Sequence, residues 1–428
     1  MKTSLRLLFL LILCGCATHK TDSPGAISSM QIIDRNGFAE TISNTDRIAT
    51  YKAVDFLAPQ PYQKVLRVFK RNEKGQSSAK ITSYHDNGQP WQYLEVVDGR
   101  AHGFYREWFS NGALKIEAHL IEGLADIHDI AQRSWVFDGM SRVFSEQGKL
   151  VAEIPYEKGV LHGVSRYYFE SGALQKSIPY TAGEIDGDLL VFNEQGDLLE
   201  RTPHVTGQKQ GISHCYWTKD VLLSAETYEN GLLQEAYYYD NAGRCVAEIH
   251  AGKGKQALFK EGLLHTLIEY QGGVPEGNVC SFYPDGTLQS TYSLKEGKKS
   301  GEEWEYYPSK PGEKPQSKLC VHWQDDLLQG VVKTWYPQGG MESQREIING
   351  KKQGLCFAWY RNGDLMLLEE YENDLLVKGS YFKKSDKAIV SKVEGGKGLA
   401  TLYSADGVFM KKIPYEKGKP KIEEDAIE

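Results

Sequence analysis

The chain has 428 residues and a formal net charge of −7 at pH 7, with no long basic run, so nucleic acid is not an expected partner. It contains 43 Gly and 25 Tyr. Glycine permits positive φ at tight turns and tyrosine favours strands, so this composition predicts many short strands joined by turns.

The N-terminus has the organisation of an export signal. A short basic segment precedes the continuous apolar run 7–13, which is too short to span a bilayer but suits the apolar region of a signal peptide. The next residues, Leu13-Cys14-Gly15-Cys16, resemble the lipobox of bacterial lipoprotein precursors. The resemblance implies that residues 1–15 are a signal peptide and that the Cys16 sulfur carries the lipid.

This anchor implies a location. Ala17 after the lipidated cysteine resembles an outer-membrane sorting signal, so we expect a lipid-anchored envelope protein on the periplasmic or surface face. Two or three acyl chains anchor a protein stably where one does not. The alternative is an ordinary cleaved signal with an incidental Cys16. No later run is apolar enough for a transmembrane helix.

Residues 16–62 lack the pattern that follows them and are predicted to be the lipidated cysteine and a spacer. Residues 45–54 are compatible with a short helix, with Asn44 or Thr45 as N-cap and Asp46 in the first turn. Pro59 and Pro61 would end it.

Beyond this spacer, residues 63–418 repeat a turn that closes on glycine. The turn glycines include Gly88, Gly112, Gly148, Gly172, Gly196, Gly243, Gly286, Gly339, Gly363 and Gly407, and several of the intervals, such as 88→112, 148→172 and 339→363, are 24 residues. Asn-Gly or Asp-Gly after a strand predicts a hairpin whose glycine takes the left-handed position of a β-bulge.

Each repeat has the same parts around its turn. A second glycine precedes many turns by nine residues, as in Gly103, Gly163, Gly187, Gly330 and Gly354. The strand between them ends in two aromatics such as Trp359-Tyr360, and the strand after the turn alternates apolar and polar residues, which indicates one apolar face. Because a lone hairpin is marginal in water, we expect about a dozen stacked hairpins in one long, twisted antiparallel sheet, with 419–428 as a charged tail.

The pattern resembles the MORN-repeat-variant family over roughly residues 64–418. The likeness is carried by Gly163…Tyr168-Phe169…Gly172-x-Leu174 and Gly354…Trp359-Tyr360…Gly363-x-Leu365. The resemblance implies an all-β hairpin scaffold that binds protein or lipid without catalysis. Some bacterial members carry a YwqK-type antitoxin label, a cytosolic role that does not suit an exported lipoprotein.

Three segments depart from the pattern. Residues 243–262 show no clear strand pair, residues 302–318 contain three prolines and predict a long loop, and the interval 112→148 carries about a dozen extra residues. This insertion, at 123–137, is the irregular place where chemistry could lie, or it is a cap over the sheet.

The sequence gives no catalytic, metal or cofactor motif. Five cysteines follow Cys16, each in a strand-like segment and with no Cys-x-x-Cys pair, which favours small buried side chains over a zinc site. An exported protein could still join one pair, such as Cys320 and Cys356. Gly252-Lys253-Gly254-Lys255 fits neither a phosphate loop nor a dinucleotide fingerprint.

Two binding functions and one catalytic function are weighed. The first is a scaffold for an envelope protein partner, attached to the membrane through its lipid. The second is a glycan- or peptidoglycan-binding module, because rows of Trp and Tyr on a sheet can stack on sugars, although such aromatics also pack sheets together. The third, an enzyme, has no motif to support it.

Overall fold

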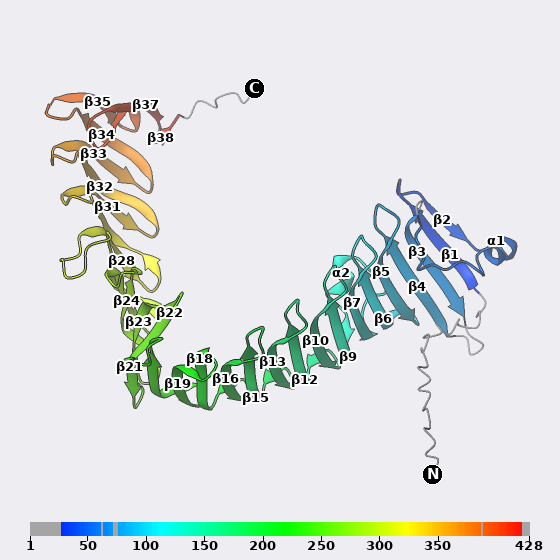
Figure 1. The fold of residues 1–428 in the computed structure, drawn as a ribbon. Coiled ribbons are helices and arrows are strands. Elements are labelled where there is room, and N and C mark those ends of the chain that lie inside the picture. Colours follow the sequence, from blue (N-terminus) through cyan, green and yellow to red (C-terminus); the bar gives the residue numbers. More distant parts are fainter. Residues whose placement is uncertain (1–26, 61–62, 72–75, 387, 422–428) are drawn as a thin grey trace, which may run out of the picture. The chain divides into compact units, whose positions relative to one another are not determined.

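A computed structural model describes residues 27–60, 63–71, 76–386 and 388–421. In this part of the chain, 38 strands belong to one long antiparallel sheet, and the two helices have five residues or fewer (Figure 1). This confirms the all-β hairpin array. The chain divides into two compact units, residues 1–174 with 180–183 and residues 175–179 with 184–428, and each is described by itself.

Apart from the four-residue β2, the first unit begins with strands of eight or nine residues, from β1 to β7. Its elements are β1 (Ile27–Asp34), β2 (Ala39–Ile42), α1 (Thr45–Ala49), β3 (Gln63–Arg71), β4 (Ser77–Tyr84), β5 (Pro90–Val97), β6 (Arg100–Trp108), β7 (Leu114–Glu122), α2 (Asp129–Gln132), β8 (Val136–Phe137), β9 (Gly139–Phe144), β10 (Leu150–Glu157), β11 (Val160–Leu161) and β12 (Gly163–Tyr168). The division between the units falls within β13 (Leu174–Thr181).

The second unit continues the hairpins. Its strands are β14 (Glu184–Ile185), β15 (Gly187–Phe192), β16 (Leu198–Val205), β17 (Gln208–Lys209), β18 (Gly211–Thr218), β19 (Val221–Glu229), β20 (Leu232–Tyr239), β21 (Cys245–His250), β22 (Lys253–Lys260), β23 (Leu263–Gln271), β24 (Val274–Phe282), β25 (Leu288–Lys295), β26 (Lys298–Lys299), β27 (Gly301–Tyr306), β28 (Ser317–Gln324), β29 (Leu327–Leu328), β30 (Gly330–Trp335), β31 (Met341–Ile348), β32 (Lys351–Trp359), β33 (Leu365–Glu372), β34 (Leu375–Phe382), β35 (Ile389–Glu394), β36 (Lys397–Tyr403), β37 (Phe409–Glu416) and β38 (Lys419–Pro420).

The predicted turn chemistry is confirmed. The turn after β6 closes with the N–H of Gly112 donating to the Phe109 carbonyl, and Gly112 has φ +86°. The register shifts by a bulge at Glu107/Trp108. The strand ends on the first aromatic and not on both, because Phe109 already opens the turn.

The opposite edge has turns that the sequence did not predict. Two-residue turns such as Lys158-Gly159 and Asn349-Gly350 have positive φ at both positions, as type I′ hairpin turns require. These two-residue turns connect successive hairpins. Where they occur, tight turns join the strands at both edges of the sheet.

The segment predicted to be a spacer contains structure. Strands β1 and β2 pair with each other, and β1 also pairs with β3, which extends the sheet before the first repeat. The predicted helix is confirmed at its start as α1, with Asn44 as N-cap accepting from the N–H groups of Asp46 and Arg47, but it is shorter than predicted and ends at Ala49 with Thr50 as C-cap, well before Pro59. The residues before Ile27, which include the predicted signal peptide and Cys16, lie outside the described residues, as does most of the predicted tail.

The structure corrects one prediction about residues 243–262. They do form a strand pair, β21 with β22, in register Ile249↔Gly254. The pattern was hidden because Gly254, at φ +152°, passes so close to the Glu248 carbonyl that an added Cβ would lie 2.2 Å from it. A glycine is therefore required where a strand residue was expected. The long loop predicted within 302–318 is confirmed between β27 and β28.

Both faces of the first sheet are covered. On one face, Ile48 of α1 packs with Leu66, Val68 and Tyr84. On the other, Ile127 and Trp135 of the insertion pack over Ile81, Leu94 and Tyr105. The second unit has smaller separate cores, and strands such as β15 and β25 contain no buried residue.

Candidate functional site

The floor of the candidate site is one row of side chains across β3, β4 and β5. Val65 pairs with Ser83, and Ser83 pairs with Gln92, so the three point to the same face. The neighbouring row on this face lies beneath the insertion. Of this row, only Val65 packs against the buried cluster under the insertion, at the margin of that cluster. The Val65–Ser83–Gln92 row forms the floor of a groove.

One wall of the groove is the insertion that the sequence singled out. Trp135 is 8% exposed, donates through Nε1 to the Leu124 carbonyl at 3.0 Å and packs against Tyr105 with ring centroids 4.7 Å apart. Asp126 receives two hydrogen bonds of 3.1 Å from Arg67 of β3. These contacts fix the insertion on the sheet, so the prediction of a cap over the sheet is confirmed.

The other wall comes from two turns. Arg35, after β1, donates to the His85 carbonyl at 2.7 Å and to Asp86 at 3.4 Å. The His85 ring lies beside the Trp91 indole, with centroids 5.7 Å apart and planes tilted by 31°. Trp91 stays 42% exposed. This end of the groove therefore combines an aromatic surface with an ion pair.

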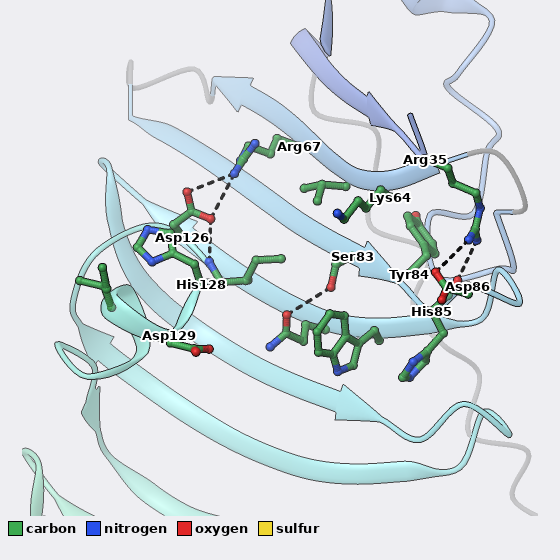
Figure 2. A pocket seen from close by; sticks show the side chains of 15 residues that line it. Arg35, Lys64, Arg67, Ser83, Tyr84, His85, Asp86, Asp126, His128 and Asp129 are labelled. Atoms are coloured by element: carbon green, nitrogen blue, oxygen red, sulfur yellow. Dashed lines mark hydrogen bonds and ion pairs between the residues drawn. The ribbon is translucent and has the colours of Figure 1, made fainter. Parts of the chain in front are cut away.

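The groove between these walls has a volume of about 1080 Å³. Figure 2 shows Arg67 with Asp126 at one end, Arg35 with Asp86 at the other, and Lys64 and Ser83 between them. The residues that line it are Arg35, Lys64, Val65, Arg67, Ser83, Tyr84, His85, Asp86, Trp91, Gln92, Asp126, Ile127, His128, Asp129 and Ile130.

A chain of polar contacts leads away from the floor. Ser83 Oγ donates to Gln92 Oε1 at 3.3 Å, Gln92 Nε2 donates to the Tyr105 hydroxyl at 3.3 Å, and that hydroxyl donates to Glu107 at 3.1 Å. Burial, followed by the charge of Glu107, raises the pKa of Tyr105. Tyr105 therefore remains a protonated donor, and the floor amide keeps one orientation.

A different polar arrangement occurs twice in the second unit. Glu226, 8% exposed, accepts from the hydroxyls of Tyr238 at 2.7 Å and Tyr228 at 2.9 Å. Glu369, also 8% exposed, accepts from Tyr381 at 2.7 Å and Tyr371 at 3.0 Å. The second cluster follows the first by 143 residues at each position (226→369, 228→371, 238→381).

Burial raises the pKa of all four tyrosines, with the neighbouring glutamate as a further cause. Each carboxylate is held by two protonated phenols inside a hydrophobic core, which is a structural use of a buried charge. Neither cluster contributes a residue to the groove of the first unit.

The prediction of small buried cysteines holds for Cys320, whereas Cys215, Cys280 and Cys356 are half-buried and Cys245 is exposed. All five described cysteines are free, including the suggested pair Cys320 and Cys356, and all lie in strands. Burial raises the pKa of Cys215, Cys320 and Cys356 to about 11, so few thiolates form near neutral pH. In the described part of the chain, no group of three or more His, Cys, Asp or Glu side chains is arranged to hold a metal ion.

The one site residue that the sequence named, Cys16, lies outside the described residues. The groove residues other than those of the insertion were missed, although one signal was present. Trp91 follows the turn glycine Gly88 by three residues, where equivalent repeats have Lys115, Val151 and Gln175. A large aromatic in a slot otherwise held by smaller or polar side chains marks a local departure from the repeat.

The fold defines a repeat protein of stacked antiparallel hairpins with a groove in its first unit. Neither helix of the described chain is long and apolar enough to cross a membrane. Two segments, residues 161–182 and 275–296, match the family described as MORN repeat variant. The chain is thus a β-hairpin scaffold that carries MORN-type repeats at these two places.

The comparisons with curated proteins and with solved structures are less informative. No curated protein matches the sequence. A solved structure described as TcdB2-TccC3 without its hypervariable C-terminal region is 10% identical and has a TM-score of 0.13; the match covers 86% of this chain and 27% of that one. A porin-like protein from Bacteroides uniformis is 8% identical with a TM-score of 0.11, over 69% of this chain and 94% of that one. TM-scores this low establish no shared fold.

Proposed function

We propose that the protein is a non-catalytic, lipid-anchored scaffold of the bacterial cell envelope that binds another envelope protein through its hairpin array. The Leu13-Cys14-Gly15-Cys16 sequence supports an anchor on Cys16 and, with Ala17, an outer-membrane location. Neither a cofactor nor nucleic acid belongs to this proposal.

The observation that carries the binding role is a stripe of exposed aliphatic side chains along one edge of the second unit. Leu232, Val274, Leu327 and Leu375 each follow a two-residue turn and are 41%, 44%, 69% and 39% exposed. Single exposed leucines are common. Here an apolar residue recurs at one position of the repeat, and Lys253, Lys298 and Lys351 hold the same position in the repeats between, so apolar and basic side chains alternate along this edge. We name these four residues the edge stripe.

Site-specific photo-crosslinking in the envelope tests the scaffold. A photoreactive residue at Leu327 or Leu375 should give an adduct of one discrete mass. Asn362 provides the control, because it is exposed in a turn at the opposite edge of the sheet. Equal adducts at Asn362, or none at the edge stripe, would refute binding through the stripe.

The anchor is tested separately. The wild-type chain should incorporate labelled palmitate and fractionate with the outer membrane, whereas Cys16→Ser should lose both properties. Cys14→Ser is the control and should keep both properties, because Cys14 belongs to the signal peptide in the proposed processing; loss of label in Cys14→Ser with retention in Cys16→Ser would contradict acylation of the Cys16 sulfur.

Glycan or peptidoglycan binding is a second candidate, which the exposed Trp91 at the groove favours. Its general test is sedimentation of the soluble Cys16→Ser chain with purified cell wall. Recovery of the protein wholly in the supernatant would exclude it.

A further inference from the structure

We propose that the groove of the first unit is a binding site for a neutral oligosaccharide. This inference rests on the second candidate function, glycan binding, and assigns it a place and a ligand class.

The groove is large for a small-molecule site. Its volume of about 1080 Å³ is at the upper end of the roughly 300–1000 Å³ of ligand pockets. A single sugar ring would leave most of it filled with water. Its length between the Arg67–Asp126 pair and the Arg35–Asp86 pair (Figure 2) favours several linked rings.

The charges of the lining residues balance. Three cations, Arg35, Lys64 and Arg67, stand against three carboxylates, Asp86, Asp126 and Asp129. Two of the cations already form ion pairs with two of the carboxylates. A polyanion such as nucleic acid or an acidic peptide would meet as much repulsion as attraction, whereas an uncharged ligand pays no such cost.

Trp91 supplies the surface that a sugar ring needs. The indole is 42% exposed and held beside His85, and the His85 ring nitrogen Nε2 is itself 2.8 Å from the Trp108 carbonyl. An indole presents a flat apolar face, which the C–H face of a pyranose matches. Its exposure has no packing explanation, since the buried cluster on this side of the sheet is formed without it.

The remaining lining groups match sugar hydroxyls, which both donate and accept hydrogen bonds. His128 caps α2 by accepting the Ala131 N–H on Nδ1, so in the neutral ring the proton lies on Nε2, which can donate. The Asp129 carboxylate of the same helix lies in the groove (Figure 2) and accepts. Donors and acceptors on one wall, opposite an aromatic wall, favour a polyhydroxylated ligand over a purely apolar one.

An extended peptide fits less well. Such peptides usually bind by adding a strand to a free sheet edge. The floor strands offer none, because β3 pairs with β1 and β4, β4 pairs with β3 and β5, and β5 pairs with β4 and β6. The backbone N–H and C=O groups of a peptide would have to be satisfied by side chains alone.

The test is saturation-transfer NMR and calorimetry on the full chain with Cys16→Ser. The probes are the tetramer of N-acetylglucosamine, cellotetraose, an acidic tetragalacturonate and an uncharged hexapeptide. We expect at least one neutral tetrasaccharide to bind, Trp91→Ala to weaken it by about tenfold or more, and Trp91→Phe to recover part of the affinity.

Phe104→Ala is the matched control, because Phe104 is 41% exposed on β6 and does not line the groove. It should bind as the wild type does, and all variants should keep the wild-type Tm. Three results would overturn the proposal: equal affinity in Trp91→Ala, stronger binding of tetragalacturonate than of neutral sugars, or binding of the hexapeptide alone. Cell-wall sedimentation that persists in Trp91→Ala would leave glycan binding intact and overturn only its placement in the groove.

Discussion

The first sheet and the hairpins of the second unit achieve stability differently. In β5, five of eight residues are buried, and two of them, Leu94 and Val96, belong to the cluster beneath the insertion. In β25 of the second unit no residue is buried. An element that packs over a sheet thus buries rows of side chains that would otherwise be half-exposed. Where that element ends, it also creates a groove.

In the second unit, hydrogen bonds from tyrosine hydroxyls link successive turns. Tyr283, Tyr307, Tyr336 and Tyr360 each donate their hydroxyl to the carbonyl at the end of a following strand, at 2.6–2.8 Å. In the first unit the equivalent turn positions include Phe109 and Phe169, which have no hydroxyl. There, Asn87 and Asn111 link successive turns instead, at 2.6 and 3.0 Å. Polar contacts between successive turns therefore occur in both units, from tyrosine hydroxyls in the second and from asparagine amides in the first.

The largest expected effect is removal of the cover. Trp135→Ala deletes a buried indole and its hydrogen bond to Leu124, so we expect the first unit to lose about 3–5 kcal/mol of unfolding free energy. Hydrogen exchange resolved by peptide should show faster exchange in β3–β6. Ile130→Ala, at a residue of the same insertion that is 71% exposed, is the control and should change little; unchanged exchange in Trp135→Ala would contradict a stabilising cover.

Next is the buried carboxylate of the second unit. Glu226→Ala leaves two buried tyrosine hydroxyls without their acceptor, so we expect a loss of about 3 kcal/mol. Glu369→Ala should give a similar loss in its own cluster. The exposed neighbour Glu229 is the control in thermal unfolding, and an equal loss in Glu229→Ala would show that the effect is not due to the cluster.

A smaller loss is expected at a close backbone approach. Gly254→Ala places a Cβ against the Glu248 carbonyl, so the β21–β22 pair must separate, at a cost of about 2 kcal/mol. Gly286→Ala also has positive φ, +82°, but open space around it, so it measures the backbone strain alone. If the two variants have the same Tm, the close approach is not what requires a glycine.

The smallest effect concerns one turn tyrosine. Tyr360→Phe removes a 2.6 Å hydrogen bond to the Phe382 carbonyl, so we expect a loss of about 1 kcal/mol at pH 7. Burial raises the pKa of Tyr360 to about 12, while an unfolded tyrosine titrates near 10. The contribution of Tyr360 is thus fully present below pH 10 and is lost as pH rises towards 12.

The difference in unfolding free energy between wild type and Tyr360→Phe should therefore shrink between pH 10 and 12, which chemical denaturation at several pH values measures. Tyr237→Phe, at a residue 38% exposed, should show no such trend. A constant difference across this range would contradict the burial of the Tyr360 hydroxyl.

Much of the array could be predicted because its turns require particular residues. Glycines such as Gly112 adopt positive φ in a bulge, and that requirement is visible in sequence as spacing. The edge turns were missed because their first residue, as at Lys158 or Asn349, has no composition in common with the others. The type of a single residue therefore does not predict whether its φ is positive.

The two glutamate clusters were missed for a different reason. In an alternating strand a buried Glu226 occupies the same kind of position as a solvated one, and only its partners Tyr228 and Tyr238 distinguish it. The signal was a long-range likeness, Tyr228-Glu229-Asn230-Gly231-Leu232-Leu233 and Tyr371-Glu372-Asn373-Asp374-Leu375-Leu376, with Gly-Lys-Gly at 252–254 and again at 396–398. The groove could not be predicted, because its walls come from turns far apart in sequence.

The turn-tyrosine bonds of the second unit have a mechanical consequence. They and the strand ladders both run from one hairpin to the next, across the strands and not along them. A pulling force applied in that direction therefore loads one ladder at a time, and the hairpins should detach in sequence at low force.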